Sequence, residues 1–427
     1  MIIKNFKKLA TDYRQNLALS IIETGLNAAM PDSALKKIIK QNHLVIKKQK
    51  ISLKKFDRVY AVAIGKSADL MLKTAISQTK IAGGIVVIPQ KSRSLIKSKK
   101  FTILYGGHPI PNTKSVCSAI KTLDFLAKLQ KDDFVIFLIS GGASSLLSLP
   151  DGISLREKQI VTNLLLKSGA NIQEINCVRK HLSKIKGGKL VESLMCQSVS
   201  LIMSDVSGDD LSSIASGLTY YDNTTFQDAK RILIKHGLKN KIPKNVWDRI
   251  DLGVNKLIQE TPKKAKMKNY VISSNKNSLD AMSKIAKKSG LAPKIVSQIS
   301  GNVESTASKL AKILPSTTNT CLIFGGEPTV KVKGRGKGGR NQELVLRLLN
   351  KLLKEKSNFI ISSIGTDGID GNTDAAGAMV ISDNASKGIK KYLDNNDSYS
   401  YFKKYGGLIF TGPTHTNLMD IGLILRV

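Results

Sequence analysis

Short runs of apolar residues recur along the chain, and each run stops at a small or polar residue. Continuous apolar runs of this length are typical of strands that are buried on both faces, as in parallel sheets. They predict strands at residues 59–64, 84–88, 134–139, 199–203, 270–272, 320–324, 359–364 and 407–410.

Amphipathic stretches lie between these runs, and they predict helices at residues 69–79, 113–129, 155–168, 278–288 and 341–354. The first 29 residues also have the pattern of an amphipathic helix. Alternation of strands and helices indicates an α/β fold, in which ligands bind beyond the carboxyl ends of the strands. The Gly, Ser and Asp clusters of this chain stand at those positions.

The polar clusters form two groups, at residues 60–219 and 325–417. The Lys-rich stretch 234–268 lies between the groups and contains two prolines, so we expect it to connect two domains. We place the N-terminal domain at residues 1–245 and the C-terminal domain at residues 246–427.

Composition excludes several classes of protein. The chain has 427 residues, of which 41% are hydrophobic, which excludes a disordered or collagen-like chain. There are 67 Lys and Arg residues against 32 Asp and Glu, a net charge of +35. The lysines are spread in small groups without a basic tail, which argues against a dedicated nucleic-acid function. A positive field can instead steer anionic substrates to a cleft.

The cysteines and the apolar runs bear on the compartment. The four cysteines are widely spaced without a CxxC motif, so neither a zinc site nor a disulfide framework is indicated. No apolar run approaches the roughly 20 residues that span a membrane. We expect a cytoplasmic protein with reduced thiols that acts on small molecules, without a membrane partner, as a monomer or homodimer.

Two segments that follow predicted strands suit anion binding. The first is Ser140-Gly141-Gly142-Ala143-Ser144-Ser145, in which free backbone N–H groups and the hydroxyls of Ser140, Ser144 and Ser145 can cradle a phosphate or carboxylate. The alternative is a tight strand-to-helix turn. In the second, Lys66 follows Gly65 and can neutralise a phosphate, although no Walker spacing precedes it.

A basic segment follows further along the chain. Asn176, Arg179 and Lys186 precede the pair Gly187-Gly188. A helix would present Arg179, Ser183 and Lys186 on one face, which suits a polyanion. The alternative is a solvated basic face that is closed by a Gly cap.

Acidic residues gather in SDVSGDD at residues 204–210. Mg²⁺ usually takes one or two carboxylates plus substrate oxygens, so Asp205 and Asp209 are candidate ligands. An Asx turn and helix cap is the alternative.

The densest cluster combines GGE at residues 325–327 with the glycine-rich segment 334–343. Residues 329–333 alternate apolar and polar positions, as a hairpin strand does. We expect a helix to begin at Asn341, with Arg340 at its N-terminus able to bind a phosphoryl or carboxylate group. Glu327 and Glu343 belong to the same candidate site. An RNA-contact loop is the alternative.

A further pair of carboxylates, Asp367 and Asp370, follows a predicted strand among glycines. The two could act as a general base, as magnesium ligands or as acceptors for substrate hydroxyls, or they could form a Gly-Asp turn. His108 is a plausible site residue or a turn histidine. No Ser-His-Asp order or metal-like His cluster appears, which argues against hydrolytic and zinc chemistry.

Together these segments resemble the glycerate kinase family whose C-terminal part is called the MOFRL domain. The matching motifs, in chain order, are GHPIPN (107–112), SGGASSLL (140–147), NCVRKHLSKIKGGKL (176–190), SDVSGDD (204–210), SGLT (216–219), GGEPTV (325–330), GKGGRNQELVL (336–346), GTDGIDGNTDAAGA (365–378) and TGPTHTN (411–417).

The resemblance implies a kinase that uses ATP and Mg²⁺ to phosphorylate D-glycerate, giving 2-phosphoglycerate. It also implies a Rossmann-like N-terminal domain with a mostly parallel sheet, a MOFRL-type α/β C-terminal domain, and an active site in the cleft between them. The family's functional positions correspond to Lys66, Asp205 and Arg340.

Two rival functions remain at this point. Members of the family have also been labelled hydroxypyruvate reductases, but an enzyme that uses NAD(P)H needs a G-x-G-x-x-G fingerprint after its first strand. The G-x-G run at residues 334–336 does not open such a unit. A basic RNA-binding protein is the non-enzymatic rival.

Overall fold

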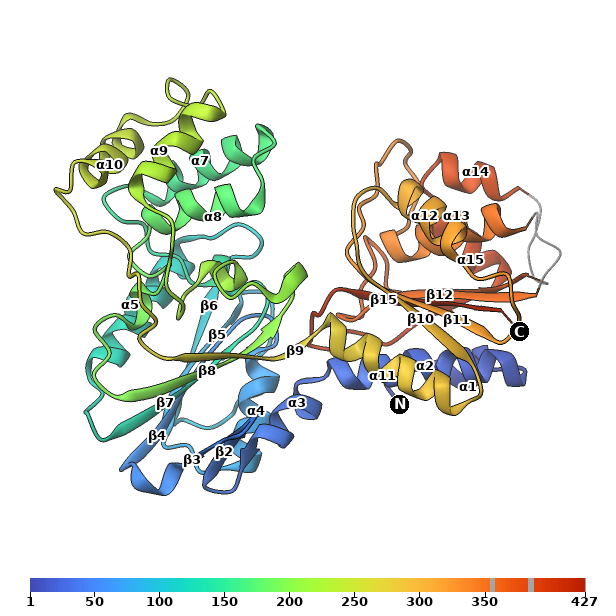
Figure 1. The fold of residues 1–427 in the computed structure, drawn as a ribbon, viewed down its shortest axis with the longest axis horizontal. Helices are drawn as coiled ribbons and strands as arrows, with labels where there is room; N and C mark the ends of the chain where they lie inside the picture. Colours follow the sequence, from blue (N-terminus) through green and yellow to red (C-terminus); the bar gives the residue numbers. More distant parts are fainter. Residues whose placement is uncertain (354–357, 383–387, 427) are drawn as a thin grey trace. The chain divides into compact units, whose positions relative to one another are not determined.

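The computed structural model describes residues 1–353, 358–382 and 388–426. The chain forms two compact units (Figure 1). One unit comprises residues 34–272, and the other combines residues 1–33 with residues 273–427. We call them the Rossmann-like unit and, after the family that its motifs resemble, the MOFRL unit.

The Rossmann-like unit is built on a six-stranded sheet with the order β6-β5-β4-β7-β8-β9. Its strands are β4 (Arg58–Ile64), β5 (Gly83–Pro89), β6 (Phe101–Gly106), β7 (Asp133–Ile139), β8 (Gln197–Ser204) and β9 (Lys268–Ser274). The pairs β5–β6, β4–β5, β4–β7 and β7–β8 are all parallel, which confirms the mostly parallel sheet. Strand β6 was not predicted, because half-exposed and exposed positions interrupt its apolar run at this edge of the sheet.

The strand order explains where a ligand site is expected. The chain builds outward from β4 through β5 to β6, then returns to the other side of β4 with β7 and β8. The order therefore reverses between β4 and β7. In doubly wound sheets ligands bind beyond the carboxyl ends of the strands at such a switch point.

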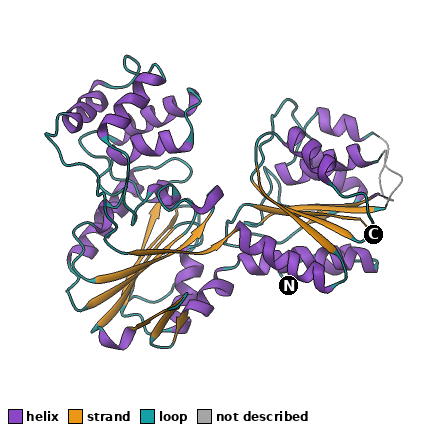
Figure 2. Cartoon of the chain, in the orientation of Figure 1, coloured by secondary structure: helices purple, strands orange, loops and turns teal. Residues whose placement is uncertain are grey.

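The helices of the Rossmann-like unit fall into two sets. Helices α4 (Ala68–Gln78), α5 (Thr113–Ala127) and α6 (Ala143–Leu146) belong to the sheet layer. Helices α7 (Leu155–Lys167), α8 (Ile172–His181), α9 (Phe226–Lys235) and α10 (Lys244–Val254) form a separate group with its own apolar core (Figures 1 and 2). Helix α3 (Pro31–Ile38) and the small antiparallel sheet β1 (Ile39–Lys40), β2 (His43–Ile46) and β3 (Gln49–Ser52) complete the unit.

Residues 234–268 do not connect the two units, as the sequence pattern had suggested. They lie inside the Rossmann-like unit, where Leu238, Ile242, Val246 and Ile250 are buried in the core of the α7–α10 group. The lysines of the segment 234–268 lie exposed on the outer surface, and the apolar residues of the same segment anchor it in the core. The chain instead passes between units near residues 33 and 272.

The MOFRL unit has a second six-stranded sheet with the order β10-β11-β15-β12-β13-β14. Its strands are β10 (Ala292–Ile299), β11 (Thr320–Gly326), β12 (Phe359–Gly365), β13 (Gly377–Ile381), β14 (Leu408–Ile409) and β15 (Asp420–Arg426). Among the assigned pairs of this sheet, only β10–β11 is parallel. Strand β15 lies antiparallel between β11 and β12, and the pairs β12–β13 and β13–β14 are antiparallel as well. The apolar runs predicted β11, β12 and β14, whereas β10, β13 and β15 were not predicted, and the runs did not reveal the direction of the strands.

Helices cover both faces of this sheet (Figure 1). On one face lie α1 (Phe6–Leu9), α2 (Tyr13–Ala29) and α11 (Asn275–Lys288); on the other lie α12 (Val303–Ile313), α13 (Arg340–Leu352), α14 (Ile389–Asp394) and α15 (Ser398–Tyr405). Burial on both faces accounts for the continuous apolar runs of β11, β12 and β15.

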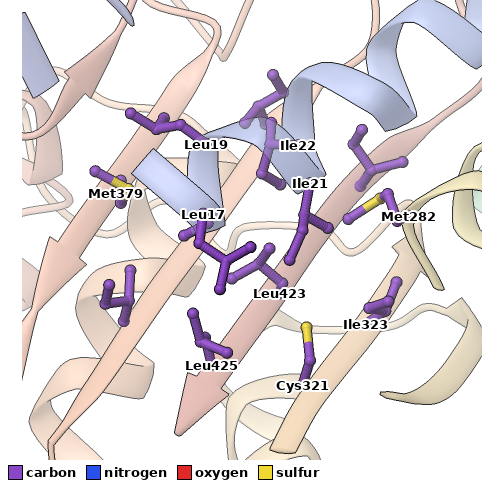
Figure 3. Close-up of a cluster of buried hydrophobic side chains, with 14 of the residues drawn as sticks. Leu17, Leu19, Ile21, Ile22, Met282, Cys321, Ile323, Met379, Leu423 and Leu425 are labelled. Carbon is purple, nitrogen blue, oxygen red and sulfur yellow. The ribbon is translucent and has the colours of Figure 1, made fainter. Parts of the chain in front are cut away.

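The first helices of the chain belong with its last strands. Leu17, Ile21 and Ile22 of α2 are buried in one cluster with Met282 of α11 and Leu423 of β15 (Figure 3). The division of the chain into units therefore differs from the expected one, which has a single boundary at residue 245. The amphipathic pattern predicted the N-terminal helix but not its partner, since any sheet with an uncovered apolar face could have received it.

The thiols and the helices give two further facts. All four cysteines are free; Cys117 is exposed, and Cys177, Cys196 and Cys321 are buried. Across the described ranges, none of the helices combines the length and the apolar character needed to cross a membrane.

Candidate active site

The loops after β4 and β7 are bonded to each other at the switch point. The backbone N–H of Lys66 donates to the Gly141 carbonyl at 2.9 Å, and that of Ser67 donates to Ser140 Oγ at 3.0 Å. Gly65 has a φ of +135°, and a Cβ atom there would overlap with Ser140. The glycine is therefore required both by its backbone conformation and by the close approach of the two loops. Ser140 thus serves to fix the position of Lys66.

Two charged side chains and a histidine surround the glycines of the β7 loop. A Cβ atom at Gly141 would overlap with Asp205 Oδ2, so the carboxylate of Asp205 lies directly against this glycine. A Cβ atom at Gly142 would lie 2.9 Å from His108 Cδ2 and 3.3 Å from Lys66 Cγ. The structure therefore brings Lys66 and Asp205, which are far apart in the sequence, to one end of the sheet.

His108 is a neutral member of this cluster. Burial and the nearby positive charge of Lys66 together lower the pKa of His108 to about 4. Its imidazole is therefore uncharged at neutral pH and can accept or donate a single hydrogen bond without adding charge.

Ser144 is the centre of a second, basic cluster. Its Oγ lies 2.6 Å from Arg179 Nη2, 2.8 Å from Lys186 Nζ and 2.9 Å from Ser216 Oγ. Ser216 donates its hydroxyl hydrogen to Asn176 Oδ1 at 2.9 Å, so Ser144 must be the donor to Ser216 and the acceptor for both cations. The Ser144 hydroxyl is therefore fully used within the protein, and the cations beside it are the groups able to meet a ligand.

The prediction that Arg179, Ser183 and Lys186 share one helix face is wrong. Helix α8 ends at His181, and the chain then turns back. Gly187 and Gly188, with φ of +65° and +90°, donate their N–H groups to the carbonyls of Ser216 and Gly217. Arg179 and Lys186 nevertheless converge, because this turn brings Lys186 back to Ser144. The glycine pair was the signal for such a turn.

The acidic segment divides into separate roles. Asp205 follows β8 directly and lies against Gly141, while Asp209 is half-buried in a single helical turn at Ser207–Asp209. Asp210 accepts hydrogen bonds from Ser212 and Ser213, as the Asx-turn alternative predicted. The described residues contain no group of three or more His, Cys, Asp or Glu side chains placed to hold a metal ion. A carboxylate such as Asp205 fits a Mg²⁺ ion that takes its other ligands from phosphates and water.

Arg340 begins helix α13 in the MOFRL unit and is held by two carboxylates. Its Nε and Nη2 lie 2.6 and 2.9 Å from the two oxygens of Asp420, and its Nη1 lies 2.6 Å from Glu327 Oε1. The bidentate geometry fixes the plane of the guanidinium. The Arg340 side chain is 30% exposed, so two of its five N–H groups remain for a ligand.

Asp420 is the functional candidate that the sequence pattern missed. It opens β15 and pairs with Gly326 of β11 and Gly365 of β12, so it lies between the GGE and GTDG motifs. A Cβ atom at Gly365 would lie 2.9 Å from Asp367 Oδ1 and 3.5 Å from Asp420 Oδ1. A single carboxylate at the start of an otherwise apolar strand was the available signal.

The protonation states of Arg340 and Asp420 follow from their burial and from the charges that they exert on each other. Burial by itself would lower the pKa of Arg340, but the negative charges and hydrogen bonds of Asp420 and Glu327 outweigh it and raise that pKa. Burial raises the pKa of Asp420 to about 7, against the lowering effect of Arg340. Arg340 therefore stays protonated, with much of its charge balanced inside the protein.

The comparisons with known proteins cover almost the whole chain. Residues 17–251 match a family described as a domain of unknown function, DUF4147, and residues 320–420 match the MOFRL family. A glycerate 2-kinase from Pyrococcus horikoshii is 37% identical, with 97% of each chain covered. The crystal structure of a glycerate kinase from Thermotoga maritima superposes with a TM-score of 0.85 at 37% identity, over 96% of this chain and 99% of that one.

The chain belongs to the glycerate 2-kinase family. A relative from Agrobacterium vitis that carries a hydroxypyruvate reductase name is 38% identical, with 77% of this chain and 78% of that one covered. Both names, glycerate kinase and hydroxypyruvate reductase, therefore occur among the relatives of this chain.

In this member of the glycerate 2-kinase family, the predicted residues Asn341, Glu343 and Asp370 of the MOFRL unit are buried, while Asp367 is half-buried. Asp370 accepts hydrogen bonds from the backbone N–H groups of Asn341 and Gln342 at 3.0 and 2.8 Å, which anchors the start of α13. Asn341 accepts from Ser363 at 2.6 Å, and Glu343 pairs with Arg347 at 2.8 Å. These contacts position α13 and thus Arg340; direct contact of Asn341, Glu343 and Asp370 with a substrate stays a prediction.

The expected hairpin strand at residues 329–333 is absent from the structure, apart from one isolated bridge at Thr329. The loop is held by other means, since the N–H groups of Lys333 and Gly334 both donate to Asn396 Oδ1. The backbone N–H groups that would pair with a neighbouring strand in a hairpin are here bonded to the side chain of Asn396 instead. The loop therefore reaches Arg340 as a bonded segment with a fixed course.

Proposed function

We propose that this protein transfers a phosphoryl group from ATP to the 2-hydroxyl of D-glycerate, giving 2-phosphoglycerate and ADP. One observation carries the proposal: Lys66 and Asp205 lie together at the switch point of the sheet. The chain that carries them is 37% identical to a glycerate 2-kinase over nearly its full length. We further propose that the enzyme acts in the cytoplasm as a monomer or homodimer.

The Rossmann-like unit supplies a cation and a carboxylate for the transfer. Phosphoryl transfer depends mainly on positioning and charge neutralisation, so Lys66 is assigned to the oxygens of the transferring group. The 2-hydroxyl oxygen forms the new bond to the γ-phosphorus while the bond to the β,γ-bridging oxygen breaks. Asp205 is assigned to accept the hydroxyl proton.

Magnesium is the cofactor expected for this reaction. Asp205 and Asp209 would hold it together with phosphate oxygens, and the ion would supply further neutralisation of the triphosphate. A carboxylate has two oxygens, so we assign Asp205 to both the ion and the substrate hydroxyl.

The MOFRL unit supplies Arg340. Asp420 and Glu327 hold its guanidinium in one orientation and leave two N–H donors. We assign these donors to an anionic oxygen of the substrates. Asp420 and Glu327 already balance part of the positive charge of Arg340. We therefore assign Arg340 chiefly to orienting the substrate through hydrogen bonds, and Lys66 to neutralising the negative charge of the phosphoryl group.

The loop after β4 argues against the reductase alternative. A dinucleotide-binding turn has glycines where the pyrophosphate approaches the backbone. Here the first turn of the sheet is Gly65-Lys66-Ser67, and it is closed by hydrogen bonds to the β7 loop. A lysine at this turn suits a phosphoryl group that has to be neutralised.

Phosphorus NMR of the protein with ATP, Mg²⁺ and D-glycerate tests the proposal. We expect the signal of 2-phosphoglycerate to appear as that of ATP declines, and the same spectrum distinguishes the 3-phosphate. Hydroxypyruvate with NADH, followed by nicotinamide absorbance, is the matched assay for the reductase. Oxidation of NADH without any phosphorylated product would refute the kinase proposal, and salt-sensitive RNA binding without turnover would favour the RNA-binding alternative.

A further inference from the structure

Two cationic side chains are bonded to Ser144, and a third lies within electrostatic range of them and of one carboxylate, Asp151. The two are Arg179 of α8 and Lys186 of the turn after α8, and the third is Lys158 of α7. The side chain of Lys158 is 4% exposed, and that of Lys186 is 0% exposed. Within the described part of the chain, the polar contacts of Arg179 and Lys186 are to neutral oxygens of Ser144. Burying several cations in this way is unfavourable unless negative charge is supplied.

Lys158 is the member that the fold leaves unexplained. Its Nζ atom is enclosed and has no hydrogen-bond partner among the described residues. Burial and then the positive charge of Arg179 lower the pKa of Lys158 to about 7. Burial, followed by the positive charges of Arg179 and Lys158, likewise lowers the pKa of Lys186, so the three side chains interact electrostatically.

We propose that Lys158, Arg179 and Lys186 form a receptor for one phosphoryl oxyanion, which reaches them past the half-exposed side chains of Ser144 and Arg179. A phosphoryl group carries about −1.5 to −2 charge at neutral pH and offers three acceptor oxygens. A single carboxylate would balance only one of the cations. The Arg179 fork and the two lysines match the acceptors of a phosphoryl group.

A purely structural role accounts for only part of the cluster. Arg179 and Lys186 hold the β7 loop through Ser144, and this contact alone could explain their presence. Lys158 Nζ has no hydrogen-bond acceptor among the residues that the structure describes, so holding a loop cannot explain this side chain. An arriving oxyanion would satisfy Lys158 and offset the repulsion among the three charges.

The source of the phosphoryl group rests on the proposed function. It is either a phosphate of the nucleotide or the phosphate of the phosphorylated hydroxy acid, and free phosphate is the third source. Each has its own probe: a non-hydrolysable ATP analogue with an imido bridge, 2-phosphoglycerate and inorganic phosphate. The probe that depends most on Lys158 identifies the source.

Calorimetric titration of the full-length protein with each probe tests the inference. We expect Lys158→Met to weaken the binding of at least one probe by about tenfold or more, because it removes one buried charge at nearly unchanged volume. Arg156→Met removes a charge from an exposed position on the same helix and is the matched control. It should leave all three affinities within about twofold.

Unchanged affinities for all three probes in Lys158→Met, or no saturable binding of any probe by the wild type, would overturn the inference. A gain in thermal stability with unchanged affinities would show that Lys158 is only an uncompensated buried charge. If Lys158→Met does not fold, Arg179→Gln at the half-exposed member must show the loss of affinity instead.

Probe binding requires no turnover, so the two proposals fail separately. Binding that depends on Lys158 in a protein without glycerate kinase activity would refute only the proposed function. Kinase activity together with binding that is indifferent to Lys158 would refute only this receptor.

Discussion

Asp420 and Arg340 face each other through two parallel hydrogen bonds, of 2.6 and 2.9 Å, although 80 residues separate them. Asp420 is buried at the start of β15, and Arg340 starts α13. The pair ties the C-terminal strand to the helix that carries the candidate catalytic arginine.

Replacing Asp420 by Asn should therefore affect both stability and turnover. The change leaves Arg340 with one charged partner, Glu327, and removing one member of a buried pair costs about 3–5 kcal/mol. Since Arg340 is 30% exposed, we expect a smaller loss of unfolding free energy, about 2–3 kcal/mol, in urea titrations. Glu327→Gln is the control; its carboxylate is 49% exposed, so the loss should be at most about 1 kcal/mol. Equal losses in the two variants would contradict the special role of Asp420.

Gly141→Ala should damage the site with little damage to the fold. The new methyl group would overlap with Asp205 Oδ2 and push that carboxylate aside. Under the proposed function we expect kcat to fall by about 10²-fold or more, which corresponds to about 2.7 kcal/mol of barrier. Gly169→Ala is the control for loss of stability without damage to the site: nothing lies within 4 Å of its Cβ position, but its φ of +77° makes an alanine strained, so we expect a lower melting temperature with unchanged kcat. Steady-state rates and thermal melting together decide; full activity of Gly141→Ala would show that the position of Asp205 is unimportant.

Lys66→Met should change the titration of His108. The positive charge of Lys66 helps to lower the pKa of His108 to about 4, second to burial. Removing that charge should raise the His108 pKa, while burial still keeps it below the ordinary value. Proton NMR of the imidazole measures this directly, independently of catalysis. An unmoved His108 pKa would mean that the two side chains are not neighbours in solution. Turnover should fall by about 10²–10³-fold in the same variant if Lys66 neutralises the transferring group.

Glu260 should contribute to acid unfolding. Burial alone would raise its pKa, but hydrogen bonds from His181 and from the backbone of Phe226 and Thr261 outweigh it and lower that pKa to about 2. A lowered pKa means that the folded state holds this proton less tightly than the unfolded state, so the stabilisation is present above about pH 4.5 and is lost as pH falls towards 2. The unfolding free energy of Glu260→Gln should therefore fall by about 1–2 kcal/mol less than that of the wild type as pH is lowered. This figure allows for solvent screening, since the Glu260 side chain is 35% exposed. Unfolding free energies measured between pH 2 and 6 check this; parallel curves for wild type and variant would contradict it.

The local sequence pattern was sufficient to predict the central strands of the Rossmann-like unit and the loops that follow β4 and β7. The runs at residues 59–64 and 134–139 predicted β4 and β7, because strands buried on both faces require apolar residues throughout. The glycines of the segment 140–145 predicted a backbone that an anion can approach, and the structure adds that Ser140 and Asp205 exclude a side chain at Gly65 and Gly141. The parallel order of the sheet then follows from the α/β alternation.

Other features had no local signal. The antiparallel insertion of β15 depends on which neighbours β11 and β12 accept, and a buried apolar run is compatible with either direction. The partner of α2 was likewise open, since an amphipathic helix specifies an apolar face but not the sheet that covers it.

The sequence by itself determined several of the buried strands, such as β4, β7, β11 and β12, the glycine-rich turns that follow them, and the family to which the motifs point. Those properties depend on the identity of residues next to one another in the chain. Tertiary structure alone decided that Lys186 returns to Ser144, that Lys158 has no acceptor in the described part of the chain, and that Asp420 holds Arg340. Such contacts join residues distant in sequence, and their energies depend on burial and geometry that exist only in the folded chain.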